Sequence, residues 1–220
     1  MRQVSPGPLD SLIAVAAPPR CGACGRGCGT GAALCHECET EILGAGAIVA
    51  AGPPGIDLAV AAAHYEGAAR LLAHGLKYGR RLQLAAFAAE RIAAACPEGE
   101  LAGTLVPVPA APWRGRWRGF DPAEEIALAL ARQTGLPFHG SCLRRGRGPR
   151  QVGRPRRERL AEPPRVALRG RQAPRSVLLV DDVHTTGATL EACARALRAG
   201  SAQRVVALVV ARSRRALGEP

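Results

Sequence analysis

The sequence predicts an α/β protein with a doubly wound, mainly parallel sheet and a small cysteine-rich module at the N-terminus. Segments typical of strands alternate with segments typical of helices over residues 56–211. Residues 177–180 are all apolar, as in a strand that is covered on both faces. Five of the eight cysteines fall within residues 21–38. We therefore expect two domains, a zinc-binding module at 1–45 and an α/β domain at 46–220.

The order of the expected elements follows from periodicity and from helix stop signals. After a linker rich in Gly, Ala and Pro, the chain is expected to form a strand at 56–65, helices at 67–79 and 82–96, a strand at 101–109, a helix at 121–135, a strand at 176–181, a helix at about 187–199 and a strand at 204–211. Asp121 and Pro122 are typical of a helix start, and Gly135 is typical of a helix end. Residues 144–175 hold twelve arginines and two glutamates with scattered prolines, which predicts a long, mobile, basic loop.

The cysteine module contains two C-x-x-C pairs, Cys21 with Cys24 and Cys35 with Cys38. Each pair can present two thiolates to one tetrahedral ion, and four thiolates with no open position suit a structural zinc. A redox pair or a disulfide cluster is the alternative.

The other metal-binding side chains are expected to take no part in this site. Cys28 and His36 lie within the module and are interpreted as bystanders. Cys96 and Cys142 are isolated, and Cys193 fits the apolar face of a helix as a small core residue.

The charge balance favours anionic partners. The formal net charge is +12, which suits phosphates or nucleic acid. Nearly all of the positive charge is arginine, and lysine occurs once, at Lys77, which is expected either to make a functional contact or to be a solvent-facing lysine that suits the end of a helix. No segment is typical of a signal peptide or a spanning helix, so we expect a soluble, cytoplasmic protein with no membrane insertion.

Two adjacent acids, Asp181 and Asp182, follow the apolar run, and Thr185, Thr186 and Gly187 lead into the next helix. Backbone N–H groups at a helix N-terminus, together with threonine hydroxyls, suit a phosphate. The two carboxylates are acceptors that suit the vicinal hydroxyls of a ribose. The pattern therefore predicts a ribose 5-phosphate site, and the alternative is a βα loop with capping threonines and solvated aspartates.

The segment VLLVDDVHTTGATL resembles the phosphoribosyl pyrophosphate (PRPP) motif of type I phosphoribosyltransferases. The wider pattern is similar to the ComF family of competence-associated, phosphoribosyltransferase-like proteins. It includes CGAC and CHEC, HYEGAARLLAHGLKYGR, LVPVP, RGFDPAEEIA and QVGRPRRER. The resemblance implies a sheet of the type I phosphoribosyltransferase kind, PRPP as ligand and Mg²⁺ with it.

The resemblance also implies roles for individual residues. Asp181 and Asp182 would bind the ribose hydroxyls. The 5-phosphate would be bound by His184, Thr185, Thr186, Gly187, Ala188 and Thr189. Candidates for the pyrophosphate and the flexible loop are Lys77, Arg114, Arg116, Arg118 and Gln151.

Some features depart from relatives in that superfamily. Purine phosphoribosyltransferases have an aspartate where this chain has Thr185, so purine salvage is not expected. The sequence after QVG differs from the usual ComF continuation, no C-terminal hood is expected over an acceptor, and glutamine amidotransfer is not expected.

Two functions remain open at this point. The first is a PRPP-dependent transferase that moves a pentosyl group to an unidentified acceptor. The second is a non-catalytic module that acts in competence by binding single-stranded DNA or proteins of the competence machinery, with Trp113 and Trp117 as the only obvious residues for stacking on bases. A P-loop NTPase is excluded, because no G-x-x-x-x-G-K-[ST] segment occurs.

Overall fold

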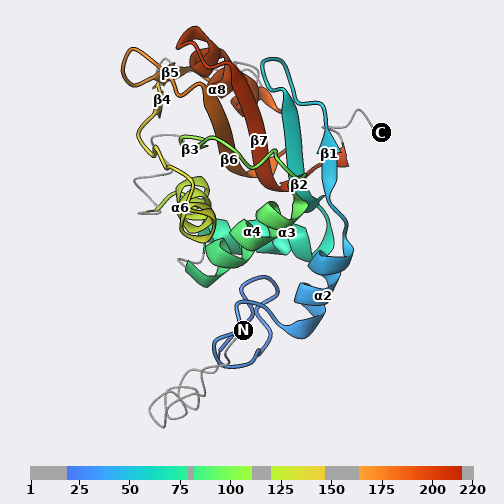
Figure 1. The fold of residues 1–220 in the computed structure, drawn as a ribbon. Helices are drawn as coiled ribbons and strands as arrows, with labels where there is room; N and C mark the ends of the chain where they lie inside the picture. Colours follow the sequence, from blue (N-terminus) through green and yellow to red (C-terminus); the bar gives the residue numbers. More distant parts are fainter. Residues whose placement is uncertain (1–18, 79–81, 111–119, 147–163, 215–220) are drawn as a thin grey trace, which may run out of the picture.

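The computed structural model describes residues 19–78, 82–110, 120–146 and 164–214 (Figure 1). Its central sheet has five strands in the order β1-β2-β7-β6-β3. The strands span Ile48–Ala50 (β1), Leu58–His64 (β2), Arg204–Arg212 (β7), Ser176–His184 (β6) and Thr104–Pro107 (β3). Strand β1 is antiparallel to β2 and the other pairs are parallel. The mainly parallel α/β sheet that the sequence predicts is therefore confirmed.

Helices cover both faces of this sheet. They span His36–Gly44 (α2), Gly67–Tyr78 (α3), Leu82–Ala95 (α4), Pro122–Thr134 (α6) and Ala188–Ala199 (α8). Leu178 and Val180 belong to the same apolar core as residues of α3, α4 and α6, whereas Val177 and Leu179 belong to the core that contains residues of α8. Because alternate residues of a strand point to opposite faces, α8 lies on the face opposite to α3, α4 and α6.

The cysteine module packs on the α/β domain. Cys21, Cys35 and Cys38 share one apolar core with Leu72 of α3 and Leu84 of α4. A Cβ atom on Gly75 would lie 2.0 Å from the carbonyl oxygen of Gly22. A glycine at position 75 therefore lets α3 approach the module backbone closely.

Three expectations about the fold are corrected. Residues 48–50 were expected in a linker but form the edge strand β1. Strand β6 was expected to end at residue 181 but continues to His184, paired with β7 up to Arg212. The ends of the basic segment are ordered, because β4 (Leu143–Arg145) and β5 (Val166–Leu168) form a second, antiparallel sheet. Residues 147–163 lie outside the described part.

The helix start and stop signals of α6 are confirmed. The Asp121 side chain accepts a hydrogen bond from the backbone N–H of Ala123 at 3.1 Å, and Pro122 occupies the first helical position. Gly135 ends the helix in the left-handed conformation with a φ of 73°. Capping thus fixes where the helix begins, directly beside the carboxyl end of β3.

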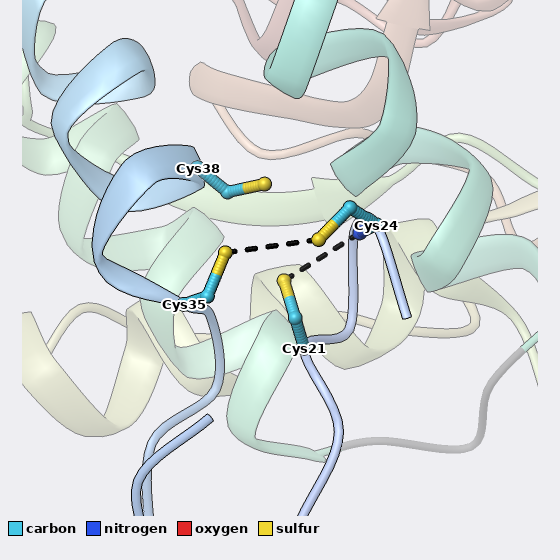
Figure 2. Close-up of side chains that lie close together, drawn as sticks. All are labelled: Cys21, Cys24, Cys35 and Cys38. Carbon is cyan, nitrogen blue, oxygen red and sulfur yellow. Dashed lines mark hydrogen bonds between the residues drawn. The ribbon is translucent and has the colours of Figure 1, made fainter. Parts of the chain in front are cut away.

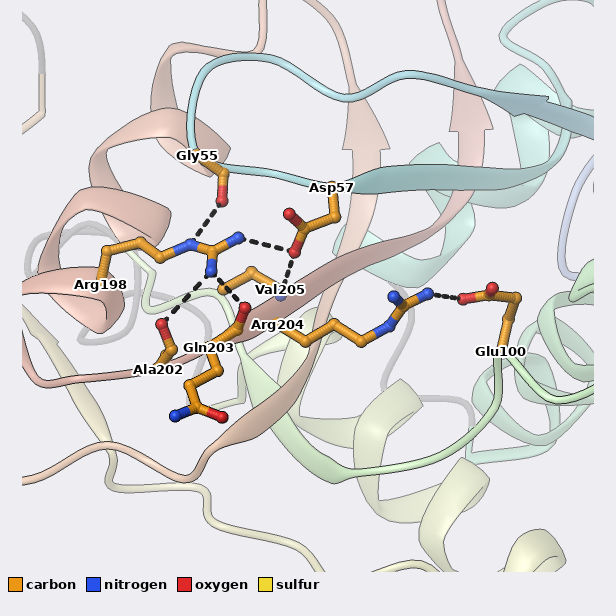
Figure 3. Close-up of polar contacts among 8 residues, drawn as sticks. All are labelled: Gly55, Asp57, Glu100, Arg198, Ala202, Gln203, Arg204 and Val205. Atoms are coloured by element: carbon orange, nitrogen blue, oxygen red, sulfur yellow. Dashed lines mark hydrogen bonds and ion pairs between the residues drawn. The ribbon is translucent and has the colours of Figure 1, made fainter.

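Arg198, in the last turn of α8, ties this helix to the amino ends of β2 and β7 (Figure 3). Its guanidinium donates to the Gly55 carbonyl at 3.2 Å, to the Gln203 carbonyl at 2.6 Å and to the Asp57 carboxylate at 2.6 Å. The same Asp57 oxygen accepts from the N–H of Val205 at 2.7 Å. Beside it, Arg204 pairs with Glu100. These bonds fix the C-terminal end of α8.

Replacing Arg198 with methionine is expected to lower the free energy of unfolding by about 2 kcal/mol, because bonds to a partly buried charged group are lost. Thermal or urea unfolding measures this difference. Arg195→Met is the matched control, because Arg195 pairs with Glu191 one turn earlier on the exposed surface of the same helix. Equal stability of the two variants would contradict the role given to Arg198.

Candidate functional site

A pocket of about 210 Å³ opens at the carboxyl ends of β3 and β6. Ligands of parallel α/β sheets bind at this edge. Its lining comes from α3, the segment after β3, the start of α6, β4, the end of β6, the turn after β6 and the start of α8. The described lining residues are Lys77, Val108, Pro109, Ala110, Phe120, Asp121, Pro122, Ala123, Arg145, Asp181, Asp182, Val183, Thr185 and Thr189.

Asp181 and Asp182 lie near the carboxyl end of β6, and both line the pocket. The Asp181 carboxylate accepts a hydrogen bond from the backbone N–H of Asp182 at 2.8 Å. Burial raises the pKa of Asp181 well above its ordinary value, and the adjacent charge of Asp182 raises the same pKa further. Both effects disfavour a second negative charge beside Asp182 in the free protein.

Lys77 pairs directly with Asp182. Helix α3 begins three residues after β2 ends and contacts both β7 and β6, so that its last turn reaches the carboxyl end of β6. There the Lys77 ammonium lies 2.9 Å from a carboxylate oxygen of Asp182, with the two side chains 26% and 12% exposed. The sequence indicated both residues as candidates, Asp182 for the ribose hydroxyls and Lys77 for the pyrophosphate. It did not predict that the two side chains pair with each other.

A third carboxylate, Asp121, lines the same pocket. It accepts hydrogen bonds from the N–H groups of Ala110 and Ala123, at 3.0 and 3.1 Å. Burial raises the pKa of Asp121, although these bonds lower it in part. Sequence reasoning recognised Asp121 only as a helix cap. Asp121 lies in the segment RGFDPAE, which follows the proline-rich end of β3. This position was the feature of the sequence that could have indicated a second role, in the pocket.

The turn after β6 and the first turn of α8 each bring a threonine into the pocket, Thr185 and Thr189. Gly187, the N-cap of α8, has a φ of 78°, and a Cβ atom there would lie 3.0 Å from Nε2 of His184. Only glycine combines this conformation with this close approach. Within the described lining, Thr186, Gly187 and Ala188 are absent, although they belong to the same turn.

His184 lies beneath this turn and is buried, with 3% of its surface exposed. Burial lowers its pKa to about 4, and the charge of Arg212 on the neighbouring strand contributes to the shift. The imidazole is therefore neutral at physiological pH and supports Gly187 by packing. The pocket lining does not include His184.

Of the other predicted contacts, Arg114, Arg116, Arg118 and Gln151 lie outside the described residues. The described part instead places Arg145, the last residue of β4, in the pocket lining. Sequence reasoning missed Arg145 because it is one of many arginines in a segment expected to be a loop.

The four cysteines of the two C-x-x-C pairs come together at the N-terminal module (Figure 2). Their sulfur atoms all lie within 4.8 Å of one another, and Sγ of Cys24 lies 3.7 Å from Sγ of Cys35. Tetrahedral zinc with Zn–S bonds of about 2.3 Å would separate its sulfurs by about 3.8 Å, so the four thiols fit one zinc ion. Hydrogen bonding with Arg26 lowers the pKa of Cys24 to about 6, which favours the thiolate.

Cys28 and His36 do not belong to this cluster within the described residues, in agreement with their interpretation as bystanders. The Cys28 thiol donates instead to the Ala32 carbonyl at 3.6 Å. Cys193 is fully buried in the α8 core, as expected.

Among the described helices, none is long and apolar enough to cross a membrane. No protein-family model and no curated protein matches the chain. The function must therefore be argued from the pocket and the cysteine cluster.

Proposed function

We propose that the chain is a PRPP-binding protein of the ComF kind, with a type I phosphoribosyltransferase fold, and that it transfers a phosphoribosyl group to an acceptor nucleophile. One observation carries the proposal: Asp181 and Asp182 share a single pocket with Thr185 of the following turn and Thr189 of α8. A sugar phosphate needs both kinds of group, acceptors for its diol and donors for its phosphate.

The turn supplies the donors. Gly187 caps α8, a helix of 12 residues, so the helix dipole favours a phosphate at this end. Thr185 and Thr189 add hydroxyl donors on the pocket side. This end of the pocket suits the 5-phosphate of PRPP.

The carboxylates supply the acceptors, and Mg²⁺ would arrive with PRPP. Carboxylate oxygens are ligands that Mg²⁺ accepts, and the ion would neutralise the pyrophosphate as it leaves C1 of the ribose. Lys77 and Arg145 are the cations of the described lining that can face the remaining negative charge. In this proposal, the cysteine cluster holds a structural zinc and takes no part in the transfer.

Recognition of the diol has a direct test. Ribose 5-phosphate is expected to compete with PRPP for the protein, and 2-deoxyribose 5-phosphate is expected to compete about tenfold less well, because one charge-assisted hydrogen bond is lost. Displacement of labelled PRPP measures both. Equal competition by the two sugars would show that the aspartates do not bind the diol.

Release of pyrophosphate separates the two functions that the sequence leaves open. Incubation with PRPP, Mg²⁺ and a panel of nitrogen nucleophiles is expected to release pyrophosphate with at least one acceptor. Binding of PRPP without release for any acceptor would contradict transferase activity and favour the non-catalytic module.

A further inference from the structure

Resting on the PRPP site proposed above, the contact between Lys77 and Asp182 suggests how that site selects its ligand. The ammonium lies 2.9 Å from the carboxylate, and both residues line the pocket. The carboxylate that a sugar diol would use is thus already paired in the free protein. A diol that takes this carboxylate must therefore separate an ion pair whose two side chains are largely shielded from solvent.

We propose that Lys77 is the specificity-determining residue of this pocket: its ammonium leaves Asp182 when the diol binds, and pairs with the pyrophosphate of the same ligand. A ligand that has both groups compensates for the broken pair. A ligand with the diol but no pyrophosphate does not.

The placement of Lys77 supports this exchange. Lys77 enters the pocket from α3, on one face of the sheet, whereas Thr189 enters from α8, on the opposite face. In PRPP, the ribose diol lies between the pyrophosphate at C1 and the phosphate at C5. With the phosphate at the α8 turn and the diol at the end of β6, the pyrophosphate lies toward α3.

The negative charges that line the pocket also require a cation beside the pyrophosphate. Three carboxylates line it, those of Asp121, Asp181 and Asp182, and they would repel a pyrophosphate. Burial raises the pKa of Asp121 and Asp181, which reduces this repulsion but leaves Asp182 as the partner of Lys77.

The choice of lysine fits a group that must change partners. Lysine occurs once in a chain that otherwise uses arginine for its positive charge. An arginine fork would hold the Asp182 carboxylate in a fixed bidentate geometry, whereas an ammonium on a four-carbon stem is a mobile point charge. The 26% exposure of the Lys77 side chain leaves its ammonium within reach of the pocket solvent.

Titration of PRPP and of ribose 5-phosphate, each with Mg²⁺, into wild-type and Lys77→Met protein tests the inference. The variant is expected to bind PRPP about tenfold more weakly or worse, because it loses a charge-assisted contact. It is expected to bind ribose 5-phosphate as well as the wild type or more tightly, because Asp182 no longer has to release a partner. Retained binding of ribose 5-phosphate also shows that the variant's pocket is folded.

Two further variants sharpen the comparison. Lys77→Arg keeps the charge but would hold Asp182 more firmly, so its preference for PRPP over ribose 5-phosphate is expected to be smaller than in the wild type and larger than in Lys77→Met. Arg70→Met removes a charge from an exposed position of the same helix and is expected to bind both sugars as the wild type does.

Loss of affinity for both sugars by the same factor in Lys77→Met would overturn the inference, since Lys77 would then only support Asp182. Unchanged affinity for both would also overturn it. Either result leaves the PRPP site standing, whereas a wild-type protein that binds neither sugar would overturn the proposed function and this inference together.

Discussion

Replacing Cys38 with serine is expected to abolish stoichiometric zinc binding and to lower the free energy of unfolding by about 4 kcal/mol, because loss of a structural metal is among the largest single-residue effects. Cys38 is 4% exposed and lies in the same apolar core as residues of α3 and α4. Metal analysis in reducing buffer and thermal unfolding measure the two effects.

The matched control is Cys28→Ser, in the same module. The Cys28 thiol lies outside the cluster and donates to a backbone carbonyl, a bond that a serine hydroxyl can also make. This variant is expected to keep its zinc and most of its stability. Wild-type protein without stoichiometric metal, or equal zinc content in both variants, would contradict the zinc site.

The shared core extends this expectation beyond the module. Since Gly22 contacts Gly75 of α3 and the cysteines pack with Leu84 of α4, loosening the module exposes apolar surface of the α/β domain. Removal of zinc by a chelator should therefore lower the unfolding temperature of the whole protein in one transition. A separate early transition, with the main one unchanged, would indicate a module that folds independently.

The sequence alone predicts those parts of the fold that depend on local pattern. Helix α6 has its cap, its proline and its terminal glycine in sequence, and β6 and β7 are apolar over long runs. The four-cysteine cluster can be predicted from spacing, because each C-x-x-C pair is local. Only one long-range contact, between the two pairs, has to form.

The remaining features depend on contacts between distant segments. Strands β4 and β5 have three residues each in an arginine-rich segment and form only because they pair with each other. Strand β6 continues through two acids because β7 pairs with it up to Arg212, so that pairing outweighs the low strand preference of aspartate. The approach of Lys77 to Asp182 depends on the path of α3 across one face of the sheet toward β6, which periodicity cannot give.

The second large effect is expected at the two acids of β6. Asp181→Asn and Asp182→Asn keep the shape of the side chain but replace a carboxyl oxygen, which can accept a hydrogen bond from a ribose hydroxyl, with an amide nitrogen that cannot. Each should weaken PRPP binding by roughly ten- to a hundredfold, the equivalent of about 1.5 to 3 kcal/mol. Asp182→Asn also frees Lys77 from the pair that it must break when PRPP binds, which offsets part of the lost diol contact.

The control is Asp57→Asn. Asp57 is also paired with an arginine, but at the amino end of β2, away from the pocket lining. Its replacement changes the two bonds that its carboxylate accepts, from Arg198 and from Val205, and is expected to affect stability without affecting the affinity for PRPP. The comparison therefore separates a local role of Asp181 and Asp182 from a general effect of losing an acid.

Calorimetric titration of PRPP with Mg²⁺ into these four proteins tests the PRPP site most directly. We expect wild type and Asp57→Asn to bind with the same affinity, and Asp181→Asn and Asp182→Asn to bind at least about tenfold more weakly. Equal affinity in all four proteins, or no binding to the wild type, would contradict the assignment of this pocket to PRPP.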